Sequence, residues 1–336
     1  MRRAGVGIDN FVDINISDNA NPNKKTVSAE YSLDTDLSAI DRLNLGKTPQ
    51  TCRVCFASGE FQTWLSIEMF FGTKDKFKYF ECPVCETLQI EEFPDNIEKY
   101  YAHDYYSYQV PQIKPVRYGA AADTRMILDV GCGAGTWLCY LASEGCTNLY
   151  GCDPFIEKNL TYANGVKIKK CTIHEIGGSY DVIHLFHSFE HMPDPREAFK
   201  SFDRLLKRGR GDQKEDPKIE IAIPVFPNAA FDVYGPYWYQ MDPPRHYFLH
   251  SVKSMKMLAE ENGFNVSSVQ YIGSGKQFYV SRMYQLGVPY MQHERRLNND
   301  PEFAGLKNQI DALNDLSHPL IIAKKTDEAF FTLHRA

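Results

Sequence analysis

Short apolar runs alternate with amphipathic segments over roughly the last two thirds of the chain. Strands that alternate with helices in this way are typical of the α/β class, in which helices cover a largely parallel sheet. The pattern therefore predicts a seven-stranded α/β sheet. The seven runs are MILDV (126–130), NLYGC (148–152), GVKIK (165–169), DVIHLF (181–186), IEIAIPVF (219–226), FNVSSVQYI (264–272) and LIIAKK (320–325).

Helix boundary signals lie between these runs. Asp194 can cap a helix that has Pro195 at its first position, and the apolar residues that follow share one face before Gly209. Segment 251–263 has the same signals, with a serine at its start and a glycine at its end. Segment 136–145, TWLCYLASEG, predicts a helix directly after a glycine-rich loop.

The first third of the chain is organised differently. Residues 1–46 are polar and lack a sustained apolar period, which predicts a mobile arm. Residues 47–112 hold two cysteine pairs, short apolar runs typical of a small β-rich module, and a tyrosine-rich bridge. Residues 113–326 then form the α/β domain, and residues 327–336 remain as a C-terminal tail. We expect the bridge to pack between the two domains.

Composition and charge narrow the possible partners. With 43% hydrophobic residues, the 336-residue chain can bury a large core. The net charge of -6 gives no general attraction for phosphate backbones or anionic lipids, which disfavours nucleic acid. No apolar run approaches the length of a membrane span, and the first residues lack the apolar core of a secretion signal. We expect a cytoplasmic protein, and the oligomeric state stays open.

The glycine-rich loop GCGAG predicts a nucleotide-type cofactor site at the end of the first strand. Gly131, Gly133 and Gly135 give GxGxG, whereas the dinucleotide fingerprint has its third glycine where this chain has Thr136. Asp129 places a carboxylate where a pyrophosphate would be repelled but a cationic amino-acid group would be tolerated. The loop therefore favours S-adenosylmethionine over NAD.

Asp153 ends the second strand, 22 residues after Gly131. A carboxylate at this position can accept hydrogen bonds from both hydroxyls of an adenosine ribose. We therefore predict that Asp129, Gly131, Gly133 and Asp153 bind the cofactor. The alternative is that the glycines form only a tight turn between strand and helix.

Three stretches, LDVGCGAGTW, YGCDP and YDVIHLFHSFEHMPDP, resemble the class I S-adenosylmethionine-dependent methyltransferases, and the resemblance extends over roughly residues 120–325. It implies the Rossmann-like seven-stranded sheet of that family, with an antiparallel last strand, here PLIIAKK (319–325). It also implies that the segment after the fourth strand lines the methyl-donor end of the cofactor and the acceptor pocket. His187 is thereby a predicted cofactor-binding residue, and His191 is a candidate base.

The same segment, HSFEH, has a second interpretation. His187, Glu190 and His191 have the HxxEH spacing of inverted zinc proteases, but that site needs all three residues on one helix. Here a strand precedes the motif and Pro193 follows it, which disfavours zinc proteolysis. A further alternative is that Glu190 and His191 only hydrogen-bond the loop into shape.

The two CxxC pairs predict a structural metal site. Each CxxC turn can direct two thiolates at one point, and four thiolates form a closed tetrahedral zinc site with no open position for a substrate. Redox chemistry is the rival interpretation, but two pairs on a β-rich module lack the βαβ context of thioredoxin-like motifs. The predicted ligands are Cys52, Cys55, Cys82 and Cys85.

A zinc-ribbon-like module ahead of such a domain resembles a subgroup of these methyltransferases that is associated with bacterial surface polysaccharide and deoxysugar biosynthesis. The resembling stretches are TCRVCFASGE, MFFGTKDKFKYFECPVCETLQI and the tyrosines after them. The resemblance implies a sugar or glycan substrate. The polar arm departs from the subgroup pattern.

The long aromatic loop after the fifth strand, residues 226–251, is the expected acceptor side. Its aromatic rings and polar groups, including Asp242 and Arg245, suit a sugar ring with hydroxyls, although they can equally cover the sheet edge. His246 is the first candidate for the base that removes the acceptor proton, because a neutral imidazole acts near pH 7, and His191 is the second. A purely structural role is the alternative for each.

These observations leave three hypotheses. The first is methyl transfer to a hydroxyl of a nucleotide-activated sugar or glycan. The second is an RNA methyltransferase whose zinc module grips RNA, which the acidic balance disfavours. The third is a protein that binds the cofactor without catalysis.

Overall fold

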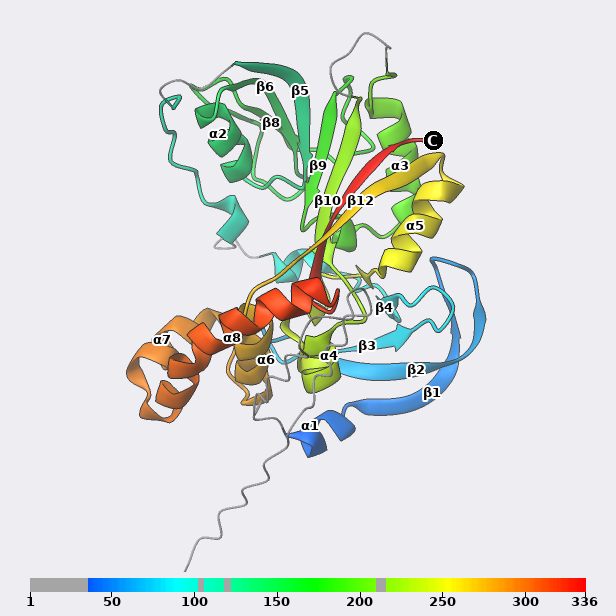
Figure 1. Ribbon diagram of the computed structural model, residues 1–336, viewed down its shortest axis with the longest axis vertical. Coiled ribbons are helices and arrows are strands. Elements are labelled where there is room, and N and C mark those ends of the chain that lie inside the picture. The colour runs from blue at the N-terminus through cyan, green and yellow to red at the C-terminus, as the bar shows by residue number, and fades with distance from the viewer. Residues whose placement is uncertain (1–35, 102–105, 118–121, 210–215) are drawn as a thin grey trace, which may run out of the picture.

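The computed structural model describes residues 36–101, 106–117, 122–209 and 216–336, which form two sheets (Figure 1). The larger main sheet has eight strands in the order β12-β13-β10-β9-β5-β6-β8-β7. The pairs from β10 to β8 are parallel, whereas β13 runs antiparallel to β10 and β12, and β7 to β8. The strands are β5 (Asp123–Val130), β6 (Cys146–Cys152), β7 (Leu160–Thr161), β8 (Lys167–Lys169), β9 (Val182–Phe186), β10 (Lys218–Pro224), β12 (Phe264–Ile272) and β13 (Glu328–Arg335).

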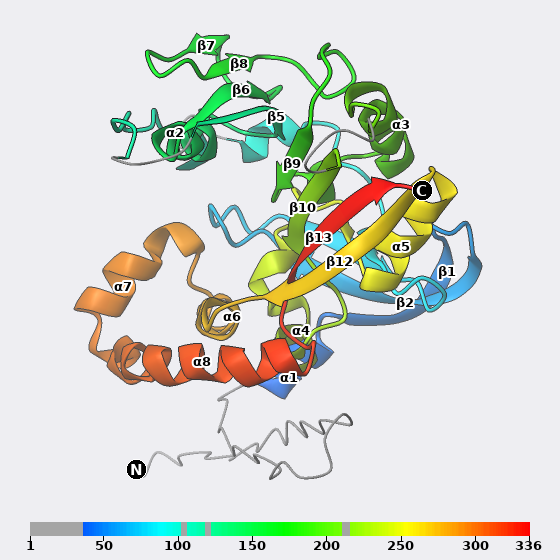
Figure 2. The ribbon, with the colours of Figure 1, turned by 45° about the horizontal axis from the view of Figure 1, so that its top comes forward.

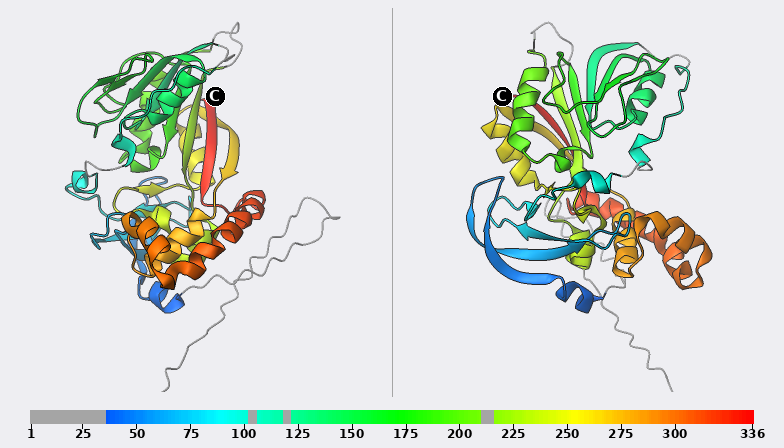
Figure 3. Two further views of the ribbon diagram at one scale, coloured as in Figure 1. Left: turned by 90° about the vertical axis from the view of Figure 1, so that its left-hand side faces the viewer. Right: turned by 180° about the vertical axis from the view of Figure 1, so that it is seen from behind.

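The helices of the α/β domain begin at the predicted signals. Helix α3 (Pro195–Leu205) is capped by the Asp194 side chain, and α5 (Val252–Glu261) starts with a capping box at Ser251. Helix α2 (Thr136–Ser143) follows the glycine loop directly. Helices α3 and α5 lie together on one face of the main sheet and α2 lies on the other (Figures 1 and 3).

Six of the seven predicted runs contain strands, and the seventh prediction is wrong. Residues 320–325 form the end of the 19-residue helix α8 (Ala304–Ile322) and a turn, because the run continues a helical segment. The antiparallel last strand is instead β13, in the segment 327–336 that was expected to be a tail. Strand β13 lies between β12 and β10, so this segment is part of the main sheet. The short β7 adds the eighth strand.

The smaller sheet contains the four CxxC cysteines at its turns and is called the cysteine sheet below. Its order is β1-β2-β3-β4-β11, with all pairs antiparallel. Its fifth strand, β11, comes from the expected acceptor loop, so the module does not end at residue 112. The strands are β1 (Asn44–Thr51), β2 (Ser58–Ile67), β3 (Lys76–Glu81), β4 (Leu88–Ile90) and β11 (Phe248–Leu249).

The expected polar arm, residues 1–46, is only partly described. Residues 1–35 lie outside the described residues, whereas helix α1 (Leu37–Asp41) and the start of β1 occupy the rest of that range. The Asp36 side chain caps α1, and its backbone N–H donates to the Gln285 side chain at 3.0 Å. Residues 36–46 therefore belong to the folded part.

A helical insertion separates β12 from β13. It contains α6 (Lys276–Gln285), α7 (His293–Asn299) and α8, and α6 packs against α4 (Ala229–Tyr234) of the acceptor loop. Figure 2 shows these helices beside the lower end of β12 and β13. Short 3-10 helices occur at Ile97–Tyr100, Tyr106–Tyr108, Phe189–His191, Gly235–Tyr237, Tyr239–Met241, Tyr290–Gln292 and Pro301–Phe303.

One continuous apolar core joins the two sheets. It includes Tyr79 and Phe80 of the cysteine sheet together with Ile183 and Ile221 of the main sheet, each at most 1% exposed. Apolar burial of this extent stabilises the two parts as one unit. Among the described helices, none combines the length and the hydropathy that crossing a bilayer requires.

Candidate active site

A cavity of ≈ 910 Å³ lies at the carboxyl ends of β5, β6 and β9. This is the edge at which α/β sheets bind ligands, and the volume is in the upper part of the range of about 300–1,000 Å³ found for ligand sites. The cavity is lined by the glycine loop, the loops after β6 and β9, the tyrosine-rich bridge and one residue of the acceptor loop. Its wall includes Ile97, Tyr101, Tyr108, Asp129, Gly131, Trp137, Asp153, Phe155, Ile173, Phe186, His187, His191, Met192 and Tyr247.

Two loop glycines have a backbone that other residues adopt with strain. Gly131 has φ of +73° and Gly133 has φ of +53°. A Cβ atom at Gly131 would lie 2.5 Å from the Cβ of Ser188, and one at Gly133 would lie 2.3 Å from the carbonyl oxygen of Ser107. The loop therefore lies directly against the segment after β9 and the tyrosine-rich bridge, and Gly131 and Gly133 have no room for a side chain.

The two predicted cofactor carboxylates flank this loop. Both Asp129 and Asp153 line the cavity, and their side chains are almost fully buried. Asp153 accepts hydrogen bonds from the N–H groups of Gly133 at 2.9 Å and Phe155 at 2.8 Å. Burial raises the pKa of Asp153, and these backbone donors oppose that rise. Each carboxylate oxygen of Asp153 has a further lone pair that can accept a ribose hydroxyl.

Asp129 lies in a less polar setting. Burial raises its pKa to about 7, while His184 lowers it and Asp153 raises it. A cationic ligand group would restore the charge of this carboxylate by direct attraction. Asp129 is therefore suited to a ligand that carries an ammonium group.

The segment after β9 places a buried carboxylate among histidines. The Glu190 side chain has no exposed area. Its Oε1 atom lies 3.5 Å from His187 Nδ1 and 3.8 Å from His246 Nε2. Burial raises the pKa of Glu190, but the histidines lower it to about 2. Burial also opposes the charge of His187, yet Glu190 and Glu328 raise its pKa to about 9. His187 is 41% exposed and lines the cavity, and its raised pKa favours the imidazolium form.

His191 lines the cavity in a fixed orientation. Its Nδ1 lies 2.7 Å from the carbonyl oxygen of Arg245 and 3.2 Å from the hydroxyl of Tyr101. A carbonyl oxygen only accepts hydrogen bonds, so Nδ1 carries the proton and Nε2 keeps a free lone pair. This is the tautomer that a general base requires.

His246 lies behind His191 and is absent from the cavity wall. The two rings are 4.8 Å apart, His246 is 4% exposed, and its Nδ1 lies 2.7 Å from the carbonyl oxygen of Gln240. Burial lowers the pKa of His246 to about 4, although Asp242 and Glu190 raise it. The structure therefore brings the second candidate base to the cavity and leaves the first candidate beneath it.

Asp242 and Arg245 hold the acceptor loop in place. Arg245 is fully buried, donates to Asp242 through Nε at 2.8 Å and through a second, shorter contact, and donates to the carbonyl oxygen of Tyr100 at 3.0 Å. Its guanidinium also lies 4.4 Å from the ring centre of Phe70. These groups connect the acceptor loop to the tyrosine-rich bridge and line no part of the cavity.

The four CxxC cysteines converge on one point, with all Sγ atoms within 4.8 Å of one another. The Sγ atoms of Cys52 and Cys85, and of Cys55 and Cys82, lie 3.5 Å apart. Zinc–sulfur bonds of about 2.3 Å in a tetrahedron place sulfurs about 3.8 Å apart, so the spacing fits a zinc ion. The two CxxC turns have the same backbone geometry, because the residue that follows each motif, Phe56 or Glu86, has φ of +61°.

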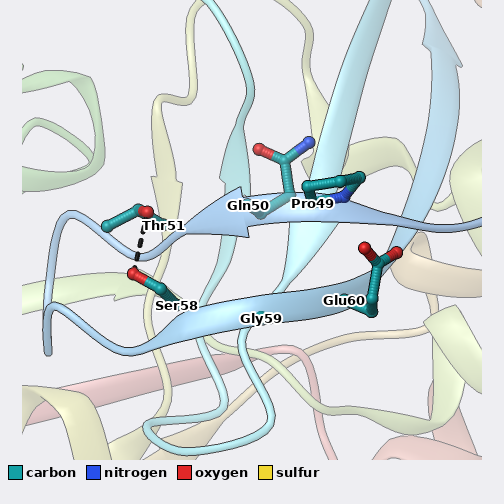
Figure 4. A pocket seen from close by; sticks show the side chains of 6 residues that line it. All are labelled: Pro49, Gln50, Thr51, Ser58, Gly59 and Glu60. Carbon is teal, nitrogen blue, oxygen red and sulfur yellow. Dashed lines mark hydrogen bonds between the residues drawn. The ribbon is translucent and has the colours of Figure 1, made fainter.

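A second hollow lies on the cysteine sheet, away from these groups. It measures ≈ 420 Å³ and occupies the surface between β1 and β2, where Thr51 and Ser58 share a 2.9 Å hydrogen bond (Figure 4). None of the predicted site residues lines it.

Several cavity residues escaped the sequence interpretation. Tyr101 and Tyr108 belong to the tyrosine-rich bridge, which was expected to pack between domains but not to line a site. Trp137 was assigned only to a helix. Glu328 lies outside the cavity wall but 3.8 Å from His187, and it was placed in the tail. The crowding of tyrosines was the one available signal.

The family profile described as "Methyltransferase domain" matches residues 101–269, which are 169 of the 336 residues. Ubiquinone biosynthesis O-methyltransferases of Cronobacter sakazakii and Escherichia coli are 32% and 30% identical to this chain in alignments of 114 positions. Each alignment covers 29% of this chain. The chain spans about half the length of these curated relatives, 47% and 48%.

Two solved structures illustrate the structural matches. A putative sarcosine dimethylglycine methyltransferase from Galdieria sulphuraria is 16% identical with a TM-score of 0.39, and covers 64% of this chain and 80% of its own. Magnesium protoporphyrin IX methyltransferase from Synechocystis is 19% identical with a TM-score of 0.31, and the match covers 44% of this chain and 62% of that protein. Because the family profile matches half of the chain, including the glycine loop and Asp153, this protein belongs to the methyltransferase domain family.

Proposed function

We propose that this protein transfers a methyl group from S-adenosylmethionine to a hydroxyl group of its acceptor. The observation that carries the proposal is the convergence of Asp129, Asp153 and His191 on one cavity. The first two fit the cationic and ribose parts of the cofactor, and the third fits proton removal from an acceptor. Family membership supports the same reaction.

The cofactor would lie across the glycine loop. Asp153 would accept hydrogen bonds from the ribose hydroxyls, Asp129 would attract the ammonium group, and Phe155 and Ile173 offer apolar surface for the adenine. By the family resemblance, His187, which lines the same cavity, would lie at the methyl-donor end of the cofactor. When bound, S-adenosylmethionine supplies an electrophilic methyl group on a sulfonium.

His191 is our choice for the base. Its Nδ1–H is held by the Arg245 carbonyl group, so its Nε2 lone pair can take the acceptor proton as the new bond forms. The buried Glu190 carboxylate would stabilise the resulting imidazolium. A base positioned in this way contributes about 10²- to 10⁴-fold to the rate. His246 would support His191 through ring contact, and a direct role for His246 would require it to reach the cavity.

The acceptor side of the cavity has apolar and aromatic walls, formed by Ile97, Tyr101, Met192 and Tyr247. Rings of this kind pack against a sugar face, which supports the hydroxyl of a nucleotide-activated sugar or glycan as the first acceptor to test. A phenolic hydroxyl is the second candidate, because the curated relatives are named as O-methyltransferases of ubiquinone biosynthesis.

We also propose that Cys52, Cys55, Cys82 and Cys85 hold a structural zinc ion. The Sγ spacing and the two matching turns support it, and four thiolates would leave no open position for a substrate. None of the nine cysteines, all of which lie in the described residues, forms a disulfide bond, which agrees with a reducing compartment such as the cytoplasm.

The test is transfer of a labelled methyl group. The protein is incubated with methyl-labelled S-adenosylmethionine and separate pools of nucleotide sugars, phenols and RNA, and the products are identified by mass spectrometry. We expect a labelled hydroxyl product from one of the first two pools and a loss of at least about 100-fold in turnover for His191→Gln. Absence of cofactor binding in calorimetry would refute the proposal, and binding without transfer would favour the non-catalytic hypothesis.

A further inference from the structure

A row of polar side chains crosses the main sheet at the level of the cofactor site. Asp129 of β5 is the register partner of His184 in β9, His184 is the partner of Glu220 in β10, and Glu220 is the partner of Thr332 in β13. Parallel strands at the centre of an α/β sheet are normally apolar on both faces. His184 is nevertheless 5% exposed, so a polar group at this position needs partners.

His184 has a hydrogen-bond partner on each side of its ring. The indole Nε1–H of Trp137 donates to His184 Nδ1 at 3.2 Å, and His184 Nε2 lies 2.8 Å from Glu220 Oε2. An indole N–H is only a donor, so Nδ1 accepts and the proton of the imidazole lies on Nε2, facing the carboxylate. Lys218 contacts the other oxygen of Glu220 at 2.8 Å. The tautomer and the orientation of His184 are therefore fixed.

Ring packing extends this arrangement to the cavity. The His184 ring stacks on the Phe186 ring, with 4.9 Å between the ring centres and 18° between the ring planes. The Trp137 ring meets Phe186 edge to face, with 5.4 Å between the centres and 66° between the planes. Both Trp137 and Phe186 line the cofactor cavity. Trp137 is 37% exposed, lies in the first turn of α2 and also stacks on Tyr140, with 5.2 Å between the ring centres. Besides these ring contacts, the hydrogen bond to His184 helps to determine its rotamer.

We propose that His184, held by Glu220, is a positioning residue that fixes the Trp137 indole as the cavity wall beside Asp129, and that this wall sets the affinity for the cofactor. The inference rests on the proposed function, because it assigns the cofactor's cationic amino-acid end to this part of the cavity. The aromatic face of an indole attracts cations. A wall that is already fixed also avoids the entropy cost of ordering a side chain on binding.

The experiment compares His184→Phe with His184→Gln. Phenylalanine keeps a ring that can stack on Phe186 but loses both hydrogen bonds, whereas glutamine can accept from Trp137 and donate to Glu220. Without the hydrogen bond to His184, the Trp137 side chain would have to be ordered on binding, which corresponds to about two- to tenfold in affinity. We therefore expect His184→Phe to raise both Kd and KM for S-adenosylmethionine by up to about tenfold. We expect kcat at saturating cofactor to change less than about twofold, because the base is not involved. His184→Gln should recover most of the affinity.

A spectroscopic readout separates positioning from general damage. The difference in emission between the wild type and Trp137→Phe isolates Trp137 from the other two tryptophans. The same subtraction is made for His184→Phe, with the double variant His184→Phe/Trp137→Phe as its reference. We expect the cofactor to change the Trp137 emission in the wild type but not in His184→Phe. Thr332→Val, which alters the same row two strands away from His184, is the control and should leave Kd and emission unchanged.

The possible outcomes are distinct. If the wild type binds no S-adenosylmethionine, the proposed function fails. If the wild type binds it but His184→Phe has the same Kd and emission, or lowers kcat at an unchanged KM, the inference is overturned. Should His184→Phe not fold, Trp137→Leu at its partly exposed position decides instead, since an unchanged Kd there would equally overturn the inference.

Discussion

Replacing Glu190 by glutamine removes one buried charge at nearly constant volume. The Glu190 side chain has no exposed area, and neither of its oxygens has a conventional hydrogen-bond partner among the described residues. Above pH 4.5 its charge is balanced by His187, because the His187 Nδ1 atom lies 3.5 Å from Glu190 Oε1 and the pKa of His187 is raised to about 9. The substitution therefore tests whether this charge stabilises the fold.

The size of the effect follows from the pKa of Glu190. The folded structure lowers it from 4.5 to about 2 in spite of burial. Since each pKa unit corresponds to about 1.4 kcal/mol, the charged form contributes about 3 kcal/mol to the free energy of unfolding. A lowered pKa gives stability that is present above pH 4.5 and is lost as the pH falls through about 2. Glu190→Gln should thus cost about 3 kcal/mol at pH 6 and progressively less below pH 4.5.

Urea unfolding of both proteins between pH 3 and pH 6 measures this difference, and Glu157→Gln, at an exposed position, is the control that should change little. Histidine NMR gives an independent check. His187 should titrate near 9 in the wild type, and its pKa should fall toward 6.5 in Glu190→Gln. A stability difference that is the same at every pH, or a His187 pKa that does not move, would refute the reasoning.

Three further predictions concern the loop, the cofactor and the metal. Gly133→Ala should destabilise the protein by about 2–3 kcal/mol in urea unfolding, because its Cβ would meet the Ser107 carbonyl group at 2.3 Å; equal stability would contradict the described loop. Asp153→Asn should weaken S-adenosylmethionine binding about 10- to 100-fold in calorimetry, since charged hydrogen bonds to the ribose are lost; wild-type affinity would remove the ribose assignment. Native mass spectrometry should find one zinc ion in the wild type and none in Cys85→Ser, which should also melt several degrees lower; a metal-free wild type would remove the zinc proposal.

The strands were predictable where apolar runs are bounded by turn residues, as in 126–130 and 181–186. The run 320–325 failed because a short apolar stretch has the same composition at the end of a helix as in a strand, and periodicity does not separate them. The true last strand, EAFFTLHR, buries Ala329, Phe331 and Leu333 at every second position, and the positions between and beside them are polar except for Phe330. That period of two was present in the sequence, and the position near the chain end hid it.

The candidate site divides in the same way. The glycine loop and Asp153 were predictable because one strand, one turn and the next strand bring them together locally. The choice between His191 and His246 depended on how the long acceptor loop folds back, with Arg245 buried against the tyrosine-rich bridge. Glu328 reaches His187 only because β13, from the end of the chain, inserts between β12 and β10. Such contacts between distant segments leave no local pattern.

The arrangement of the cysteine sheet bears on what that sheet does. Its strand β4 pairs with β11 of the acceptor loop, the Tyr79 hydroxyl donates to the carbonyl oxygen of His246 at 2.8 Å, and Ser251 Oγ donates to the Cys85 carbonyl oxygen at 2.6 Å. The cysteine sheet thus holds both ends of the segment that carries Tyr247 into the cavity wall. The cysteine sheet also shares its apolar core with the main sheet. These contacts tie the folding of the cysteine sheet to the position of Tyr247. If a zinc ion occupies the four cysteines as proposed, we therefore expect its removal to weaken binding of the proposed acceptor before binding of the cofactor.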